Sequence, residues 1–227
     1  LVAAGLGIRE ELVLVASTGV IGKPLPMERI RVAVPGLVKG LSRTGMDGIA
    51  AAIMTTDTFP KTETVAGEVG GTTYTIAGVA KGAGMIMPNM ATMLSFLVTD
   101  AEVDPGLLRR LFREAVDSSF NVITIDGDTS TNDTALLMAN GTAGNPVIRE
   151  GTPEAGIFAG LLRQVLVSLA RQIVRDGEGA TKLVEIRVRG ALSDAEAKRA
   201  AMAVANSLLV KTAFFGQDAN WGRILAA

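Results

Sequence analysis

The sequence contains no cysteine and no histidine among its 227 residues. The lack of cysteine excludes disulfides, thiolate nucleophiles and thiolate metal ligands from the given sequence. The lack of histidine excludes a Ser-His-Asp triad and imidazole metal ligands. If the protein is an enzyme, its nucleophile is therefore a serine, a threonine, a lysine or a carboxylate. Its general base is a carboxylate, a lysine or a chain-terminal amine.

Neither a strong charge of one sign nor a long apolar run is present. The 22 Lys and Arg residues nearly balance the 23 Asp and Glu residues, and the formal net charge is −1. We therefore expect no nucleic-acid partner. No apolar run approaches the roughly 18 residues of a membrane-spanning helix, so we expect no membrane insertion. A chain of this length forms one large domain or two small ones around a real hydrophobic core.

Apolar periodicity predicts helices and strands that interleave along the chain. Helices are expected over 26–41, with Pro35 as an internal breaker, and after the capping residues Asp104, Thr152 and Ser193. Short apolar runs predict strands at 12–16, 72–79, 92–98, 122–125, 135–138, 183–188 and 208–214. The pattern predicts an α/β fold of the α+β type, in which mixed sheets pack against helices.

Glycine is abundant, with 26 of 227 residues, and it gathers in short clusters between apolar segments. Thr18 and Gly19 follow an apolar run, where a hydroxyl and an N–H group suit an oxyanion hole or belong to an ordinary turn. Lys81 opens a Lys-Gly-Ala-Gly loop that is either a loose phosphate cradle or a turn with an exposed lysine. Glu178 stands between two glycines, where it faces a cationic substrate or belongs to a solvated loop.

Thr92 also has two interpretations. In the predicted strand 92–98 it is an ordinary strand residue. If the Ala91–Thr92 bond is cut, Thr92 becomes a chain terminus whose own α-amine, with a pKa of roughly 7.7–8.0, can act as its base. A threonine hydroxyl needs such a base to become a nucleophile, and this sequence has no histidine to provide it.

The acidic segment 126–133 (Asp-Gly-Asp-Thr-Ser-Thr-Asn-Asp) suggests a hard cation such as Ca²⁺. An EF-hand loop requires glycine at its sixth position and glutamate at its twelfth, but Thr131 and Leu137 stand there. A polar loop between two apolar strands is the alternative. A glycine-rich binding domain that holds phosphate or Ca²⁺ is thus the non-enzymatic interpretation of these clusters.

Seven motifs occur in a fixed order: Ser17-Thr18-Gly19-Val20-Ile21-Gly22, Met54-Thr55-Thr56-Asp57, Lys81-Gly82-Ala83-Gly84-Met85, Ala91-Thr92-Met93-Leu94, Ser130-Thr131-Asn132-Asp133-Thr134, Glu178-Gly179-Ala180-Thr181-Lys182 and Asn220-Trp221-Gly222-Arg223. This ordered series resembles the glutamate N-acetyltransferase/ornithine acetyltransferase family of arginine biosynthesis, the ArgJ family. The resemblance covers essentially the whole chain. It implies the self-processing fold that this family shares with related aminopeptidases.

The resemblance further implies that the precursor cuts itself between Ala91 and Thr92. Residues 1–91 would form the C-terminal part of an α chain and 92–227 the N-terminal part of a β chain, which together make one catalytic core. Chains of the family extend past both ends of this sequence, which starts at Leu1. The family assembles as an α₂β₂ heterotetramer in the cytoplasm and needs no metal or other cofactor.

By the same resemblance, the hydroxyl of Thr92 takes an acetyl group from N-acetylornithine and passes it to glutamate through an acetyl-threonine intermediate. Thr18 and Gly19 match the family's oxyanion hole. The positions that match its substrate-binding residues are Thr55, Lys81, Thr92 and Glu178. Acetyl-CoA as a second acetyl donor is left open. The alternative is an amidase or aminopeptidase with the same N-terminal threonine, in which water takes the acyl group.

Overall fold

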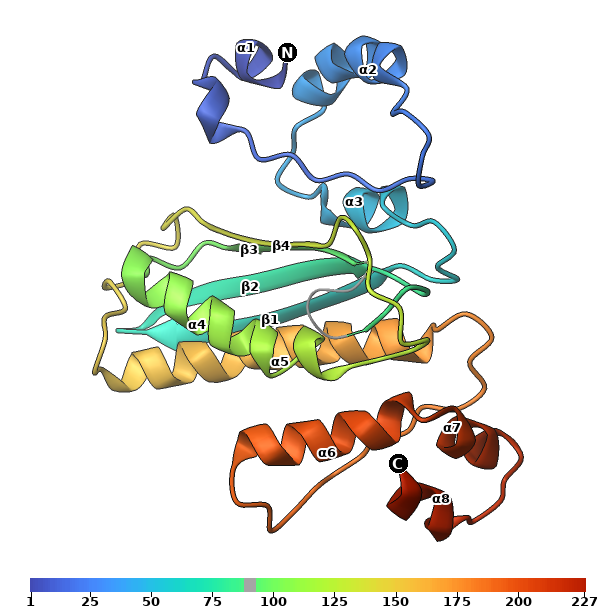
Figure 1. Ribbon diagram of the computed structural model, residues 1–227. Helices are drawn as coiled ribbons and strands as arrows, with labels where there is room; N and C mark the ends of the chain where they lie inside the picture. Colours follow the sequence, from blue (N-terminus) through green and yellow to red (C-terminus); the bar gives the residue numbers. More distant parts are fainter. Residues whose placement is uncertain (88–92) are drawn as a thin grey trace. The chain divides into compact units, whose positions relative to one another are not determined.

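The computed structural model describes residues 1–87 and 93–227 and contains two compact units, 1–49 and 50–227. The first consists of short helices joined by irregular segments, with α1 packed on α2 (Figure 1). Its elements are α1 (Val2–Leu6), the 3₁₀ helix η1 (Glu10–Leu12) and α2 (Met27–Lys39). Helix α3 (Met46–Ala52) includes the boundary between the units.

The second unit is built on a four-stranded sheet in the order β1-β2-β3-β4 (Figure 1). The strands are β1 (Lys61–Val69), β2 (Thr72–Lys81), β3 (Leu94–Thr99) and β4 (Thr134–Ala139). The first three pair antiparallel, whereas β3 and β4 pair parallel. This mixed sheet confirms the predicted fold class.

Strands β1 and β2 form a hairpin with a two-residue loop, because Val69 pairs with Thr72. The loop residues Gly70 and Gly71 have φ angles of +58° and +79°. Positive φ at both positions is the geometry of a type I′ turn, which favours glycine. Strand β2 was predicted from the sequence, but β1, whose pattern is mostly polar, was not. The Gly-Gly pair was the signal that would have identified the hairpin.

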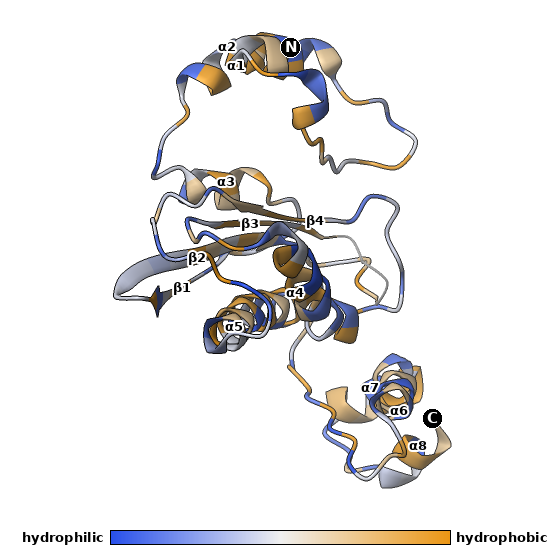
Figure 2. Ribbon diagram, turned by 90° about the vertical axis from the view of Figure 1, so that its left-hand side faces the viewer, coloured by the Kyte–Doolittle hydropathy of each residue, from blue (hydrophilic) through white to orange (hydrophobic). Residues whose placement is uncertain are grey.

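Helices α4 (Pro105–Asp117) and α5 (Pro153–Arg175) cover one face of the sheet, as Figures 1 and 2 show from two sides. Both begin where the sequence predicted. The carboxylate of Asp104 accepts hydrogen bonds from the N–H groups of Gly106 (2.9 Å) and Leu107 (3.0 Å). The hydroxyl of Thr152 accepts one from the N–H of Ala155 at 3.3 Å. These side chains satisfy backbone donors that the first helical turn leaves free.

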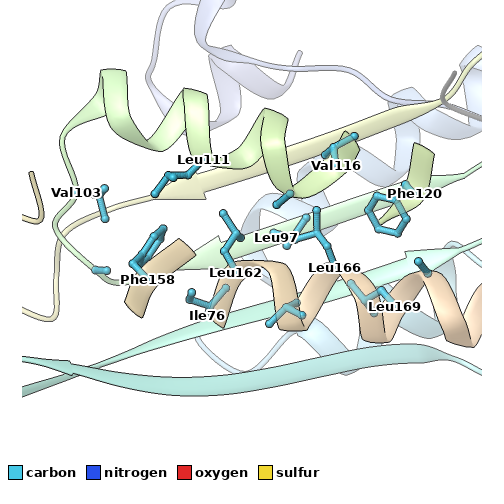
Figure 3. Close-up of a cluster of buried hydrophobic side chains, with 14 of the residues drawn as sticks. Ile76, Leu97, Val103, Leu111, Val116, Phe120, Phe158, Leu162, Leu166 and Leu169 are labelled. Atoms are coloured by element: carbon cyan, nitrogen blue, oxygen red, sulfur yellow. The ribbon is translucent and has the colours of Figure 1, made fainter. Parts of the chain in front are cut away.

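The hydrophobic core lies between these helices and the sheet (Figure 3). Its labelled members are Phe158, Leu162, Leu166 and Leu169 of α5, Leu111 and Val116 of α4, Ile76 and Leu97 of the sheet, Val103 before α4, and Phe120 in the 3₁₀ turn after α4. By length and hydropathy alone, α5 would suffice to cross a membrane, a property that the sequence analysis did not register. Eight of its residues are buried in the core, which identifies it as a core helix.

Three helices follow in the second unit: α6 (Asp194–Asn206), α7 (Leu208–Phe215) and α8 (Trp221–Ala226). Helix α6 begins at the predicted cap, where the Ser193 hydroxyl accepts a hydrogen bond from the N–H of Glu196 at 3.2 Å. A hydrogen bond of 2.6 Å from the ammonium of Lys211 to the carbonyl of Ile125 links α7 to the segment after η2 (Phe120–Val122).

Four predicted strands are wrong. Segment 183–188 is irregular, and segments 12–16 and 122–125 are irregular except for their first residues, which belong to η1 and η2. Segment 208–214 lies in α7. A short apolar run does not distinguish a strand from a helix, and a strand forms only where a neighbour accepts its backbone hydrogen bonds. Helix α2 also continues through Pro35, which the sequence analysis treated as a breaker.

Gly78 of β2 faces α5 at close range. A Cβ atom there would lie 2.9 Å from Cδ1 of Leu169 and 3.1 Å from Cγ1 of Val165. We expect Gly78→Ala to lower the free energy of unfolding by about 1–3 kcal/mol, because it overpacks the core. Urea denaturation measures the change. The control is Gly160→Ala on α5, where a Cβ has open space among the described residues. It should raise the free energy by about 0.5–1 kcal/mol. Equal stability of the two variants would contradict the close approach.

Candidate active site

Lys81 and Thr55 form a direct contact in the structure. Lys81 is the last residue of β2 and is 3% exposed. Its Nζ donates a hydrogen bond of 2.7 Å to the hydroxyl of Thr55, which lies in the exposed loop before β1. Burial lowers the pKa of Lys81, and the negative charges of Asp57 and Glu178 oppose this shift. Two predicted substrate-binding residues are thus brought together at the C-terminal end of β2.

A buried group of three charges lies directly beside this pair. The ammonium of Lys61 donates to Oδ1 of Asp57 at 2.7 Å and to Oδ2 of Asp176 at 2.6 Å. The side chains of Lys61 and Asp57 are 0% exposed and that of Asp176 is 3% exposed. Lys61 is the first residue of β1, and Asp176 caps the end of α5. None of the three was predicted from the sequence as a site residue.

Both aspartates of this group are held in the charged form. Burial by itself raises the pKa of Asp57, but hydrogen bonds from the N–H of Gly82, the ammonium of Lys61 and the N–H of Thr55 lower it below its usual value. Burial likewise raises the pKa of Asp176, and the hydrogen bonds from Lys61 and Thr58 outweigh that effect. A carboxylate that accepts several hydrogen bonds is stabilised over its neutral form.

The loop after Lys81 is anchored by Asp126. Its carboxylate accepts hydrogen bonds from the N–H groups of Met85 (2.6 Å) and Ile86 (3.0 Å). The N–H of Ile125 in turn donates to the carbonyl of Ile86 at 2.8 Å. The acidic segment 126–133 therefore contributes a backbone anchor. No group of three or more acidic side chains within the described ranges is arranged to hold a metal ion.

Glu178 lies over the same loop. Its N–H donates a hydrogen bond of 2.8 Å to the carbonyl of Ala83. A Cβ atom on Gly84 would lie 2.9 Å from both Cδ and Oε1 of Glu178, so a glycine at that position leaves room for the carboxylate. The residue is exposed, and its charge acts on the ammonium of Lys81. The loop thus places an exposed carboxylate near a buried ammonium.

A cavity of about 300 Å³ adjoins Glu178. Most of its wall is apolar, and its charged members are Glu178, Lys182 and Lys211. The ammonium of Lys182 donates to the carbonyl of Phe215 at 3.0 Å, and that of Lys211 donates to Ile125. Backbone carbonyls thus hold both ammonium groups, and Glu178 is the acidic residue among those that line this cavity.

Asp133 contacts Met93, the residue at which the described chain resumes. Its Oδ1 accepts a hydrogen bond of 2.8 Å from the N–H of Met93, and the N–H of Thr134 donates to the carbonyl of Met93 at 3.0 Å. Its Oδ2 is buried and finds no hydrogen-bond partner in the part of the chain that the structure describes. Burial raises the pKa of Asp133 to about 6, although hydrogen bonds from Met93 and Ser130 oppose the shift.

The remaining predicted site residues lie outside the described part of the second unit. Ala91 and Thr92 lie outside the described residues. Thr18 and Gly19 belong to the first unit, in an irregular segment where Thr18 is half-buried and Gly19 is exposed. The described residues thus place Thr55, Lys81 and Glu178 around one loop. Of the buried charges behind them, Asp57 belongs to the recognised motif Met54-Thr55-Thr56-Asp57, but no role was predicted for it, for Lys61 or for Asp176.

The titration of Asp133 is expected to affect stability. A pKa of about 6 in the folded state, against an ordinary 3.8, means that folding favours the protonated carboxyl. Stability that is present below pH 3.8 is therefore lost as the pH rises through about 6. We expect Asp133→Asn to remove this loss. The difference in the free energy of unfolding between the variant and the original protein should therefore rise by roughly 1–3 kcal/mol as the pH passes through this interval. Urea unfolding over a pH series measures it, and parallel profiles would contradict the shift.

Comparison with known proteins identifies one family for this chain. The model of the ArgJ family matches residues 1–227. The chain is 70% identical over its whole length to the arginine biosynthesis bifunctional protein ArgJ of Geobacter sulfurreducens, and 58% identical to the protein of that name from Symbiobacterium thermophilum. It spans 58% and 56% of these relatives, little more than half of their length.

A solved structure supports the fold. The crystal structure of the arginine biosynthesis bifunctional protein ArgJ from Bacillus halodurans, at 2.00 Å resolution, matches with a TM-score of 0.58 and 49% sequence identity. The match covers 60% of this chain and 63% of that one. The family model extends over every residue of the sequence, in agreement with the ordered motifs. The chain belongs to the ArgJ family.

Proposed function

We propose that this chain is part of an acetyltransferase of arginine biosynthesis that moves an acetyl group from N-acetylornithine to glutamate. The observation that carries the proposal is the convergence of the Lys81–Thr55 pair and the Glu178 carboxylate on one loop. The next described residue after that loop is Met93, which follows Thr92 in the sequence. Membership of the ArgJ family supports the same assignment.

The proposed maturation is an autocatalytic cut between Ala91 and Thr92. The Thr92 hydroxyl attacks the carbonyl carbon of Ala91, and the peptide bond gives way to an ester while the α-amine of Thr92 is released. Water then hydrolyses the ester, which leaves a carboxylate on Ala91 and returns the hydroxyl. The products are residues 1–91 as part of an α chain and 92–227 as part of a β chain. The released amine is the base that a chain without histidine needs.

The proposed acetyl transfer has two halves. The Thr92 hydroxyl attacks the acetyl carbonyl of N-acetylornithine while the α-amine accepts its proton and returns it to the departing ornithine amine. The resulting acetyl ester is then attacked by the amine of glutamate, and the Thr92 hydroxyl re-forms. In each half, the hydroxyl of Thr18 and the N–H of Gly19 stabilise the negative oxygen of the tetrahedral intermediate. A covalent ester divides one difficult step into two easier ones.

Charge explains how the two amino acids would be recognised. The ammonium of Lys81 suits a substrate carboxylate as a point charge, and Thr55 offers a hydroxyl beside it. The carboxylate of Glu178 suits the side-chain ammonium of ornithine. The cavity of about 300 Å³ beside Glu178 has the size of a small-molecule site. A carboxylate and an ammonium binding group near each other are the minimum that an amino-acid substrate requires.

The family resemblance extends the proposal to assembly and location. We assign an α₂β₂ heterotetramer in the cytoplasm, in which each processed pair forms one catalytic core, with no metal or organic cofactor. Native mass spectrometry of the processed protein checks the assembly. Acetyl-CoA is a second donor to be tested in the same assays.

Thr92→Ala should leave one uncut and inactive chain, because it removes the hydroxyl that starts the cut. The measurement is a denaturing intact-mass spectrum of the protein expressed from its complete gene. The unaltered protein should give two species divided at Ala91–Thr92. Thr92→Ser keeps a hydroxyl and is the matched control that should still cut. A processed Thr92→Ala protein would refute the assignment of the nucleophile.

The acceptor of the acetyl group distinguishes the transferase from the amidase alternative. We expect the processed protein to release ornithine from N-acetylornithine together with an equal amount of N-acetylglutamate when glutamate is present. Chromatographic product analysis with and without glutamate decides the question. Acetate release at a rate that glutamate does not alter would instead identify an amidase with the same nucleophile.

A further inference from the structure

We infer that Lys61 is a positioning residue for the proposed reaction, because its ammonium links the Thr55–Lys81 pair to Glu178. The inference rests on the proposed function, in which these residues recognise opposite charges of an amino acid. Lys61 lies behind the binding residues, fully buried, and the geometry gives it no contact with a substrate. Its effect is exerted through two aspartates.

Asp57 links Lys61 to the Thr55–Lys81 pair. Its Oδ1 accepts hydrogen bonds of 2.7 Å from both the Lys61 ammonium and the N–H of Gly82, the residue that follows Lys81. Its Oδ2 accepts one of 3.1 Å from the N–H of Thr55. One carboxylate therefore fixes the backbone on both sides of the Lys81–Thr55 contact.

Asp176 links Lys61 to the segment that carries Glu178. Its Oδ2 accepts hydrogen bonds from the Lys61 ammonium at 2.6 Å and from the N–H of Thr58 at 2.9 Å, and its Oδ1 accepts one from the Thr58 hydroxyl. Asp176 ends α5 and stands two positions before Glu178 in the sequence. The backbone of Glu178 is also hydrogen-bonded to Ala83. The position of Asp176 therefore sets the position of the Glu178 backbone, from which the exposed carboxylate extends.

The ammonium of Lys61 has further contacts within this arrangement. Besides the two carboxylates, it donates a longer bond of 3.5 Å to the carbonyl of Phe59 and lies 4.9 Å from the centre of the Phe59 ring. Apolar replacements of buried ion pairs are often as stable as the pairs themselves, so packing alone does not require a lysine here. A charge held between two carboxylates does fix the distance between the segments that carry them.

The deciding experiment compares variants of the full protein from its complete gene. Lys61→Met removes the bridge and leaves two buried aspartates facing each other, which threatens folding. The double variant Lys61→Met/Asp176→Asn removes one positive and one negative charge and thus keeps the net charge of the group. Arg110→Met on the exposed face of α4, which removes ion pairs with Glu114 and Glu150, is the control remote from the site.

We expect the double variant to unfold at a higher temperature than Lys61→Met, because one of the two facing carboxylates is neutralised, yet to show KM values for N-acetylornithine and glutamate raised about tenfold or more. Arg110→Met should leave both KM values unchanged. If Lys61 were only structural, the double variant would regain the original KM values together with stability, and that result would overturn the inference. If the unaltered protein transfers no acetyl group, the proposed function itself fails, which is a separate outcome.

Discussion

The arrangement of the candidate site depends on one ammonium group held between two buried carboxylates. Lys61 lies within 2.7 Å of Asp57 and 2.6 Å of Asp176, and all three side chains are almost completely removed from solvent. A buried charge without a partner is costly, so each member constrains where the other two can lie. Through this constraint, the start of β1, the end of β2 and the end of α5 meet at one place.

The apolar contact between α5 and the sheet brings these charges together. The long buried face of α5 packs on β1 and β2, and Gly78 leaves space for Val165 and Leu169 to approach closely. This packing aligns the last turn of α5 with the C-terminal end of β2, where Lys81 lies. Hydrophobic burial is not directional, whereas the ion pairs and hydrogen bonds are. The core therefore brings the segments together, and the polar network defines their final register.

Long helices with capping residues were predicted well because their signals are local. Asp104 and Thr152 begin α4 and α5 as expected, and the apolar stripe of α5 faces the core. Short apolar runs were predicted poorly. Segment 208–214 is helical instead of extended, and β1, which has a mostly polar pattern, was missed. A run of six or seven residues fits either structure, and the choice depends on which neighbours are available.

The sequence by itself determined the family, the local helix starts and the individual motifs that contain Thr55, Lys81 and Glu178, because these are properties of residue order and spacing. Only the tertiary structure decided that the Lys81 ammonium meets the Thr55 hydroxyl and that Lys61 joins Asp176 across 115 positions of the chain. A lone charged residue in a sequence carries no record of its partner. The pairing follows from burial, which makes an unpaired charge too costly and leaves the nearest opposite charge as its partner.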